Sequence, residues 1–170
     1  NLALLAEAYG KAGQVEEGLT ALTEALAVVD KTGERFWEAE VYRLKGELLL
    51  TQEIKRQKSK GKSQKSENPN PQSAFPNPQS EAEACFQKAI DIARHQQAKS
   101  LELRAAMSLI RLRQHQAVHH GSRNTEHESR TRLAEAHRML SEIYGWFTEG
   151  FDTKDLQEAK ALLDSLESSV

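Results

Sequence analysis

The stretch LALLAEAYGKAGQVEEGLTALTEALAVV, residues 2–29, decides the fold class. Its apolar residues recur three and four positions apart, which is the spacing of one face of an α-helix. Leu2, Leu5 and Tyr9 share such a face before Gly13, a residue type that favours a helix end. A second apolar stripe contains Val15, Leu19, Leu22, Leu26 and Val29. We therefore predict a helical hairpin with a short connection.

Helical spacing recurs along most of the chain, and no segment alternates as a strand between turns does. We predict a third helix over about 36–52 and, from a capping box of Ser80 and Glu83, a fourth that begins at Ser80. The expected buried face of the fourth helix comprises Ala82, Cys85, Phe86, Ala89, Ile90 and Ala93. Further helices are expected from about Ser100, around 133–143, and after an N-cap at Asp152 or Thr153. The predicted fold is all-α, with the first helix paired to the second, the third to the fourth, and the Ser100 helix to the next one.

Two polar stretches interrupt the helical pattern. Residues 55–79 hold a lysine-rich run and then all four prolines, and such a composition cannot bury enough apolar area to offset the entropy of ordering. We predict a disordered insertion there and a polar loop over 114–132. The predicted organisation is 1–54, a hairpin plus the first helix of a second; 55–79, the insertion; 80–113, completion of the second hairpin and the next helix; 114–132, the loop; and 133–170, the last hairpin helix and a terminal helix.

The first hairpin resembles a tetratricopeptide repeat, in which small and large residues alternate at fixed spacings so that two helices approach closely. The residues that carry the resemblance are Ala6, Tyr9, Gly13, Gly18, Leu22 and Ala25. A second unit has Gly46 and Leu49 on one helix and, after an insertion of about 24 residues, Ala82, Phe86 and Ala89 on the next. A third unit is represented by Ala136 and Leu140, with Ile143 where the repeat has a small residue. Stacked hairpins of this kind form an α-solenoid.

Longer stretches resemble one particular group of repeat regions. They include GERFWEAE at 33–40, RLKGELL at 43–49, SLELRAA at 100–106 and YGWFTEGFD at 144–152. These are similar to the C-terminal tetratricopeptide region of large bacterial signalling proteins, in which a class III adenylate or guanylate cyclase domain precedes an AAA-like ATPase domain. The resemblance implies a regulatory or scaffolding tail, and no cyclase or ATPase motif lies in this chain to carry over. The helical register at Leu2 leads us to expect that the chain is a C-terminal fragment.

Composition narrows the possible partners. The formal charge of -2 gives no overall attraction to nucleic acid or to anionic membranes, and no apolar run has the length of a membrane span. Cys85 is the only cysteine, so an internal disulfide is excluded, and a reducing cytoplasm is the expected compartment. We expect neither a nucleic-acid nor a membrane partner.

Few residues suggest chemistry. The chain has no phosphate-binding glycine loop and no metalloprotease motif, so we expect no catalytic residue, no cofactor and no metal site. His115 and His119 have the i, i+4 spacing of a metal clip, with His120 adjacent, but the simpler interpretation is solvated histidines. The run from Lys55 to Lys65 lacks the interleaved aromatics of a nucleic-acid site, and we interpret it as a solvated loop.

Three aromatic residues are candidates for contact with a partner. Trp37 lies on a packing stripe, and we predict it to be in the core. Trp146 and Phe147, beside two glycines, are either partner anchors or a staple that holds the terminal helix.

The sequence thus predicts a non-catalytic module for protein interaction. Its expected partner is a peptide or the upstream part of its own polypeptide, and the apolar face of Leu2, Leu5 and Tyr9 makes self-association possible. One alternative is internal regulatory packing without an external ligand. The other, from a different class, is a small histidine-based metal-binding protein.

Overall fold

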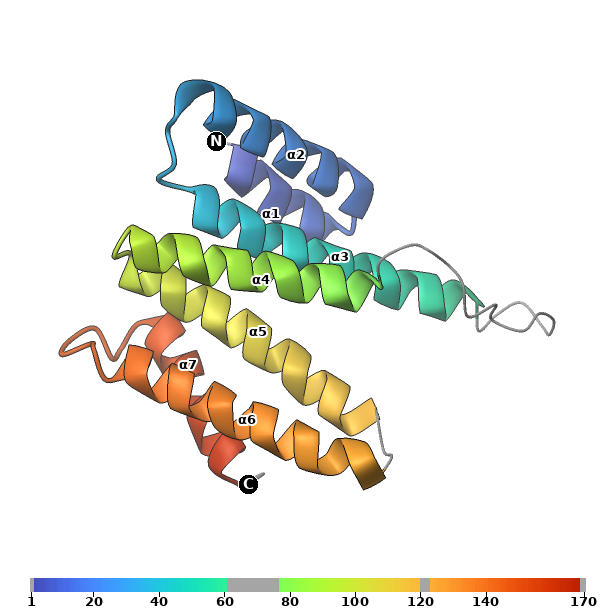
Figure 1. Ribbon diagram of the computed structural model, residues 1–170. Coiled ribbons are helices and arrows are strands. Elements are labelled where there is room, and N and C mark those ends of the chain that lie inside the picture. Colours follow the sequence, from blue (N-terminus) through green and yellow to red (C-terminus); the bar gives the residue numbers. More distant parts are fainter. Residues whose placement is uncertain (1, 61–76, 120–122, 169–170) are drawn as a thin grey trace.

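The computed structural model describes residues 2–60, 77–119 and 123–168, and these segments contain helices and no strands. Figure 1 shows the seven helices of the described segments. They are α1 (Leu2–Ala12), α2 (Val15–Thr32), α3 (Glu38–Lys60), α4 (Pro78–His95), α5 (Lys99–His119), α6 (Arg123–Tyr144) and α7 (Lys154–Glu167). The prediction of an all-α fold is confirmed.

The helices pack in the order that the hairpins predict. Helix α1 pairs with α2, α3 with α4, and α5 with α6, while α7 packs on α6 and α5. Successive pairs contact each other, because α2 packs against α3 and α4 packs against α5. The chain therefore forms a row of hairpins in sequence order.

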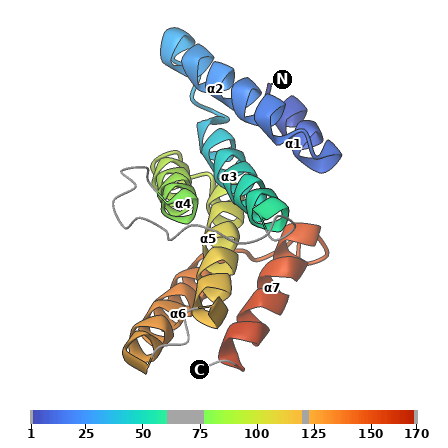
Figure 2. The ribbon, with the colours of Figure 1, turned by 90° about the vertical axis from the view of Figure 1, so that its right-hand side faces the viewer.

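The row has two layers (Figure 2). Helices α1, α3, α5 and α7 lie on one side, and each contacts the next along this layer. Helices α2, α4 and α6 form the other side, and within the described residues they make no contact with one another. The odd-numbered layer is thus the continuous one, and it is the layer that positions the site described below.

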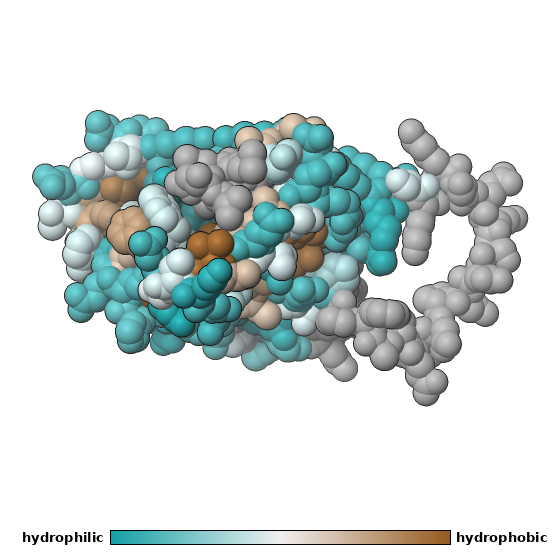
Figure 3. Space-filling view, turned by 90° about the horizontal axis from the view of Figure 1, so that it is seen from above, coloured by the Kyte–Doolittle hydropathy of each residue, from teal (hydrophilic) through white to brown (hydrophobic). Residues whose placement is uncertain are grey.

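The hydrophobic core follows the row as two clusters. The smaller cluster is centred on Leu22 and joins α2 to one face of α3. The larger cluster joins α4, α5, α6 and α7 around Phe86 and Leu140. The predicted buried face of α4 is confirmed, because all six of its residues are buried, Cys85 among them. Viewed onto the α1–α2 end, the surface is mainly hydrophilic, with hydrophobic residues in scattered places (Figure 3).

Helices α3 and α4 approach closely at Gly46. A Cβ atom added there would lie 2.6 Å from Cε1 of Phe86, whose ring is fully buried. Real Cβ atoms do not tolerate such a separation, so the absence of a side chain at Gly46 is what admits the Phe86 ring.

Positive backbone angles mark two of the helix ends. Gly13 has φ +78° in the connection between α1 and α2, and Gly33 has φ +72° as the left-handed C-cap of α2. Its N–H donates to the carbonyl of Val29 at 2.8 Å, which satisfies one orphan acceptor of the helix. The predicted end at Gly13 and the predicted start of α2 at Val15 are both confirmed.

The predicted polar interruptions are wrong over part of their length. Helix α3 continues to Lys60, so residues 55–60 are helical, and residues 61–76 lie outside the described segments. Lysine, arginine and glutamine are good helix formers, and the Lys55 ammonium donates to the Gly13 carbonyl across the interface with α1. Residues 114–119 and 123–132, also predicted as loop, belong to α5 and α6. Where their burial is described, residues 127, 128 and 130–132 are exposed, and Arg132 pairs with Glu128 at i, i+4, so polar side chains are tolerated there.

Helix α4 begins earlier than its sequence signal indicates. Its N-cap is Asn77, whose side-chain Oδ1 accepts from the N–H of Gln79 at 3.1 Å. Pro78 occupies the first helical position, where its fixed φ suits the helix and its missing N–H costs nothing. The capping box at Ser80 is therefore not the start of the helix. For α7, the sequence predicts an N-cap at Asp152 or Thr153, and it is Thr153, without a side-chain capping hydrogen bond.

Candidate interaction surface

The odd-numbered helices line an open hollow of about 600 Å³. Each of α1, α3, α5 and α7 contributes charged side chains to its lining. The positive groups are Lys11, Arg43, Arg104, Arg111 and Lys154, and the negative groups are Glu7, Glu40, Glu47, Asp155 and Glu158. The two signs balance, so the hollow carries no net formal charge at neutral pH.

Arg43 is the centre of the lining on α3. Its guanidinium donates to both oxygens of Glu40, from Nη2 at 2.7 Å and from Nε at 2.9 Å, and to Glu47 from Nη1 at 2.5 Å. Burial alone would lower the pKa of Arg43, but the two carboxylates outweigh it and raise that pKa above its ordinary value. A planar guanidinium held by two carboxylates has little conformational freedom, so this cluster forms a well-ordered part of the lining.

Arg104 on α5 connects three helices. Its Nε donates to Oδ2 of Asp155 at 2.6 Å, and its Nη1 lies 3.6 Å from Oε1 of Glu40. Asp155 belongs to the first turn of α7, where the helix dipole also favours a negative charge. The side chain of Arg104 is 42% exposed, so it is only partly covered by these pairs.

Arg111 and Glu158 form the next connection between α5 and α7. Nη2 of Arg111 donates to Glu158 at 2.7 Å, and Nζ of Lys154 lies 3.6 Å from the same carboxylate. The hydrogen bond from Arg111 is the largest cause that lowers the pKa of Glu158. Arg104 and Arg111 lie about two turns apart on one face of α5, so their spacing along the hollow is fixed.

An apolar recess of about 400 Å³ adjoins the hollow between α3, α4 and α5. Its lining is largely carbon, supplied by Leu50, Ile54, Phe86 and Leu112. Four residues line both spaces, namely Glu47, Thr51, Ser108 and Arg111. The hollow and the recess are therefore neighbouring spaces that share part of their lining.

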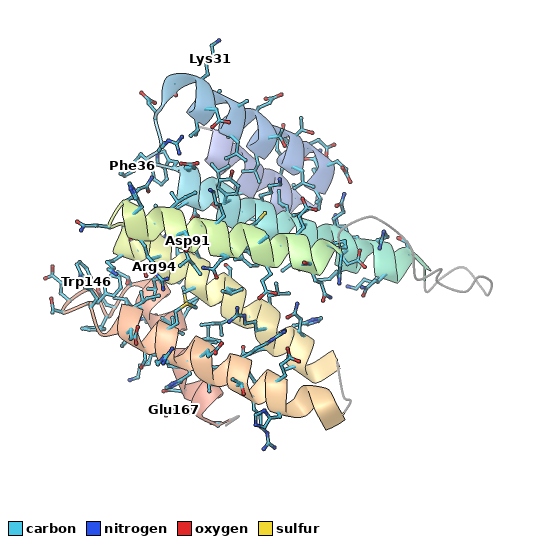
Figure 4. All side chains as sticks on the ribbon, viewed as in Figure 1. Lys31, Phe36, Asp91, Arg94, Trp146 and Glu167 are labelled. Atoms are coloured by element: carbon cyan, nitrogen blue, oxygen red, sulfur yellow. The ribbon has the colours of Figure 1, made fainter. Side chains whose placement is uncertain are left out.

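The exposed aromatic residues lie elsewhere, at the edge where α2 leads into α3 and α6 into α7 (Figure 4). Phe36 is 70% exposed and Trp37 47%, so the prediction that Trp37 is in the core is wrong. The reason is that α3 begins at Glu38, which leaves Trp37 in the connection, packed edge to face on Phe36. Trp146 is 61% exposed, whereas its neighbour Phe147 is half-buried against the larger core cluster.

The residues that carry the repeat resemblance lie mostly inside the molecule. Tyr9 is half-buried against the smaller cluster, and Gly13 forms the turn after α1. The buried ones are Gly18, Leu22, Ala25, Gly46, Leu49, Ala82, Phe86, Ala89, Ala136 and Leu140. The side chains of Ala6, Leu2 and Leu5 lie outside the described part of the chain. These positions build the scaffold and do not line the hollow.

The histidine and lysine candidates are not brought together as a site. His115 is exposed on α5 at the edge of the apolar recess, and the side chains of His119 and His120 lie outside the described residues. In the described segments no three histidine, cysteine, aspartate or glutamate side chains are grouped so as to hold a metal ion. Arg56 of the basic run pairs with Glu53, and Lys62 and Lys65 fall outside the described segments.

Sequence reasoning missed the charged lining. Glu40, Arg43 and Glu47 are spaced i, i+3 and i+7, a readable signal for one charged helix face. The pairs from Arg104 to Asp155 and from Arg111 to Glu158 carry no such signal, because their partners are 51 and 47 residues apart.

Comparisons with known proteins leave this surface to be interpreted from its own geometry. No protein-family model, no curated protein and no solved structure matches the chain. Within the described residues, none of the helices has the length and apolar character that crossing a bilayer requires.

Proposed function

We propose that this chain is a non-catalytic, tetratricopeptide-like scaffold that binds an extended protein segment in the charged hollow. The observation that carries the proposal is the shared lining, because all four odd-numbered helices present charged side chains to a single space. Stacked hairpins commonly bind partners on the surface that such a continuous layer of helices forms.

The size of the hollow favours a peptide over a folded domain. A space of about 600 Å³ falls in the range of sites that enclose small ligands or a few residues of chain. The lining offers guanidinium donors and carboxylate acceptors, which match the carbonyl and N–H groups of an extended backbone.

The balanced charge predicts how the partner is held. A peptide of one sign gains little from a neutral hollow, so its affinity comes from hydrogen bonds with Arg104 and Arg111, the half-exposed guanidiniums. We therefore expect affinity to depend less on salt than it does for a highly basic or acidic groove.

The resemblance to the tail of cyclase–ATPase signalling proteins suggests the partner. We propose that the bound segment belongs to the upstream part of the same polypeptide and that the chain is a regulatory tail. The second candidate is internal packing with no external ligand. It is favoured by the fact that every arginine of the hollow already pairs with a carboxylate of the chain.

The test uses a displayed library of random peptides of about twelve residues, selected on this protein. Bound peptides are synthesised, and their dissociation constants are measured by fluorescence polarisation. Arg104→Ala and Arg111→Ala should each weaken binding by about tenfold, since each removes a charge-assisted donor. Arg132→Ala is the matched control, because Arg132 pairs with a carboxylate on α6 outside the hollow.

Two results would contradict the proposal. Failure to select any peptide would favour internal packing. Equal losses for Arg104→Ala and Arg132→Ala would show that peptides bind outside the hollow.

A further inference from the structure

The apolar recess beside the hollow has the composition of a side-chain pocket. Figure 1 shows α5 running away from α3 toward their C-terminal ends, and the recess lies where the two helices separate. Leu50 and Ile54 of α3 contribute accessible carbon to its lining, and the side chains of Phe86 from α4 and Leu112 from α5 lie buried behind it.

Two hydroxyl groups of the recess already donate within the chain. The hydroxyl of Thr51 donates to the backbone carbonyl of Glu47 at 2.9 Å, and that of Ser108 donates to the Glu47 carboxylate at 2.9 Å. An incoming polar group would find neither donor free, whereas an apolar group would displace water from carbon at little cost.

Ile54 is the most telling residue of the recess. It is 47% exposed, although few large aliphatic side chains on the described surface are exposed to this extent. Its position at the edge of an apolar space makes it a contact that a bound group would cover.

We infer that the recess receives one large apolar side chain, of the size of leucine, methionine or phenylalanine, from the peptide that occupies the hollow. This inference rests on the proposed function and specifies the sequence of the partner. Because Arg111 and Ser108 line both spaces, a chain bound in the hollow lies beside the recess that its side chain would enter. A space of about 400 Å³ holds a side chain of this kind, and it is too small for a folded surface.

The experiment uses the peptides selected on the whole protein and asks whether they share an apolar anchor. Each is remade with alanine at its large apolar residue, and Ile54→Gln is compared with Val28→Gln. Val28 is the matched control because it is 49% exposed on α2, away from the recess. Circular dichroism melting of both variants verifies that the fold is retained.

We expect the alanine peptides to bind about tenfold more weakly, as the loss of a central anchor does. Ile54→Gln should weaken wild-type peptides about threefold and leave the alanine peptides unaffected, since the two changes remove the same contact. Val28→Gln should change nothing.

Three results would overturn the inference. If peptides depend on Arg104 but not on Ile54, the recess is not used, and the proposed function stands. If no peptide binds at all, both fail together. If 1-anilinonaphthalene-8-sulfonate binds to the wild type and not to Ile54→Gln while peptides are indifferent to Ile54, the recess is a small-molecule site instead.

Discussion

The ring of Phe86 occupies the space that a side chain at residue 46 would need. The Phe86 ring has no exposed surface, and the nearest ring atom lies 2.6 Å from where a Cβ of residue 46 would stand. Removing the ring leaves a cavity, while adding a methyl group at Gly46 overpacks the contact. The two positions are therefore coupled.

The first prediction is a double-mutant cycle at this contact. Phe86→Ala should cost about 3 to 5 kcal/mol of unfolding free energy, and Gly46→Ala about 1 to 3 kcal/mol despite the helix propensity of alanine. Gly46→Ala combined with Phe86→Ala should cost less than the sum of the two single changes, because removing the ring makes room for the methyl group. Urea unfolding followed by circular dichroism measures all four proteins. Additive costs would mean that the two residues do not share this space.

Glu102 is a second residue at which the surroundings decide the energetics. Its side chain is 3% exposed, and it accepts from Nε of Arg94 at 2.8 Å and from Nζ of Lys99 at 2.7 Å. Burial alone would raise the pKa of Glu102, but the hydrogen bonds from Lys99 and Arg94 outweigh it, so the pKa lies below its ordinary value of 4.5.

The second prediction is the pH dependence that follows from this lowered pKa. A carboxyl group with a lower pKa in the folded state contributes stability above its unfolded pKa, and that contribution is lost as pH falls through the folded pKa. Glu102→Gln should therefore cost about 2 kcal/mol at pH 7, and the difference from the wild type should vanish well below pH 4.5. Melting temperatures of the two proteins between neutral and acidic pH measure this. A difference that persists unchanged in acid would assign the cost to packing.

At the scale of the elements, the sequence predicts where helices exist better than where they end. Apolar spacing identifies the faces of α2 and α4 because burial imposes it directly. Helix ends depend on competing local signals. At α4 the N-cap Asn77 and the following Pro78 start the helix two residues ahead of Ser80, where the capping box predicts its N-cap. At the end of α3 the polar residues 55–60 remain helical because their propensity is high and one of them, Lys55, bonds across to Gly13.

The third prediction separates the two candidate caps of α4. Asn77→Ala should cost about 1 kcal/mol, because it removes the acceptor for the N–H of Gln79. Ser80→Ala should change stability by less than about 0.5 kcal/mol, since residue 80 lies inside the helix with an exposed side chain. Denaturation midpoints of the two variants provide the measurement. A larger loss for Ser80→Ala would restore the start that the capping box predicts.

At the scale of the whole molecule, the hollow could not be predicted from the sequence, because its lining comes from separate helices. Three of its helices, α3, α5 and α7, are joined by pairs such as Arg104 with Asp155, and these pairs depend on how successive hairpins are placed against one another. Spacing within one helix can suggest a charged face, as for Glu40 and Arg43, but not the helix that the face meets.

The last prediction concerns cooperativity along the row of hairpins. Each described helix contacts only helices one or two places away in the sequence, and the core consists of two clusters, one centred on Leu22 and one that includes Leu140. Both leucines are fully buried, so Leu22→Ala and Leu140→Ala should each cost about 2 to 5 kcal/mol locally. Because nearest-neighbour stacks transmit such losses weakly, Leu22→Ala should accelerate amide hydrogen exchange in α1 and α2 and leave α6 and α7 protected, and Leu140→Ala should do the reverse. Exchange measured by mass spectrometry on peptic fragments distinguishes the two ends, with the unaffected end of each variant as the control for the other. If both substitutions accelerated exchange equally throughout, the clusters would belong to one cooperative unit, and the independence of the two ends would be wrong.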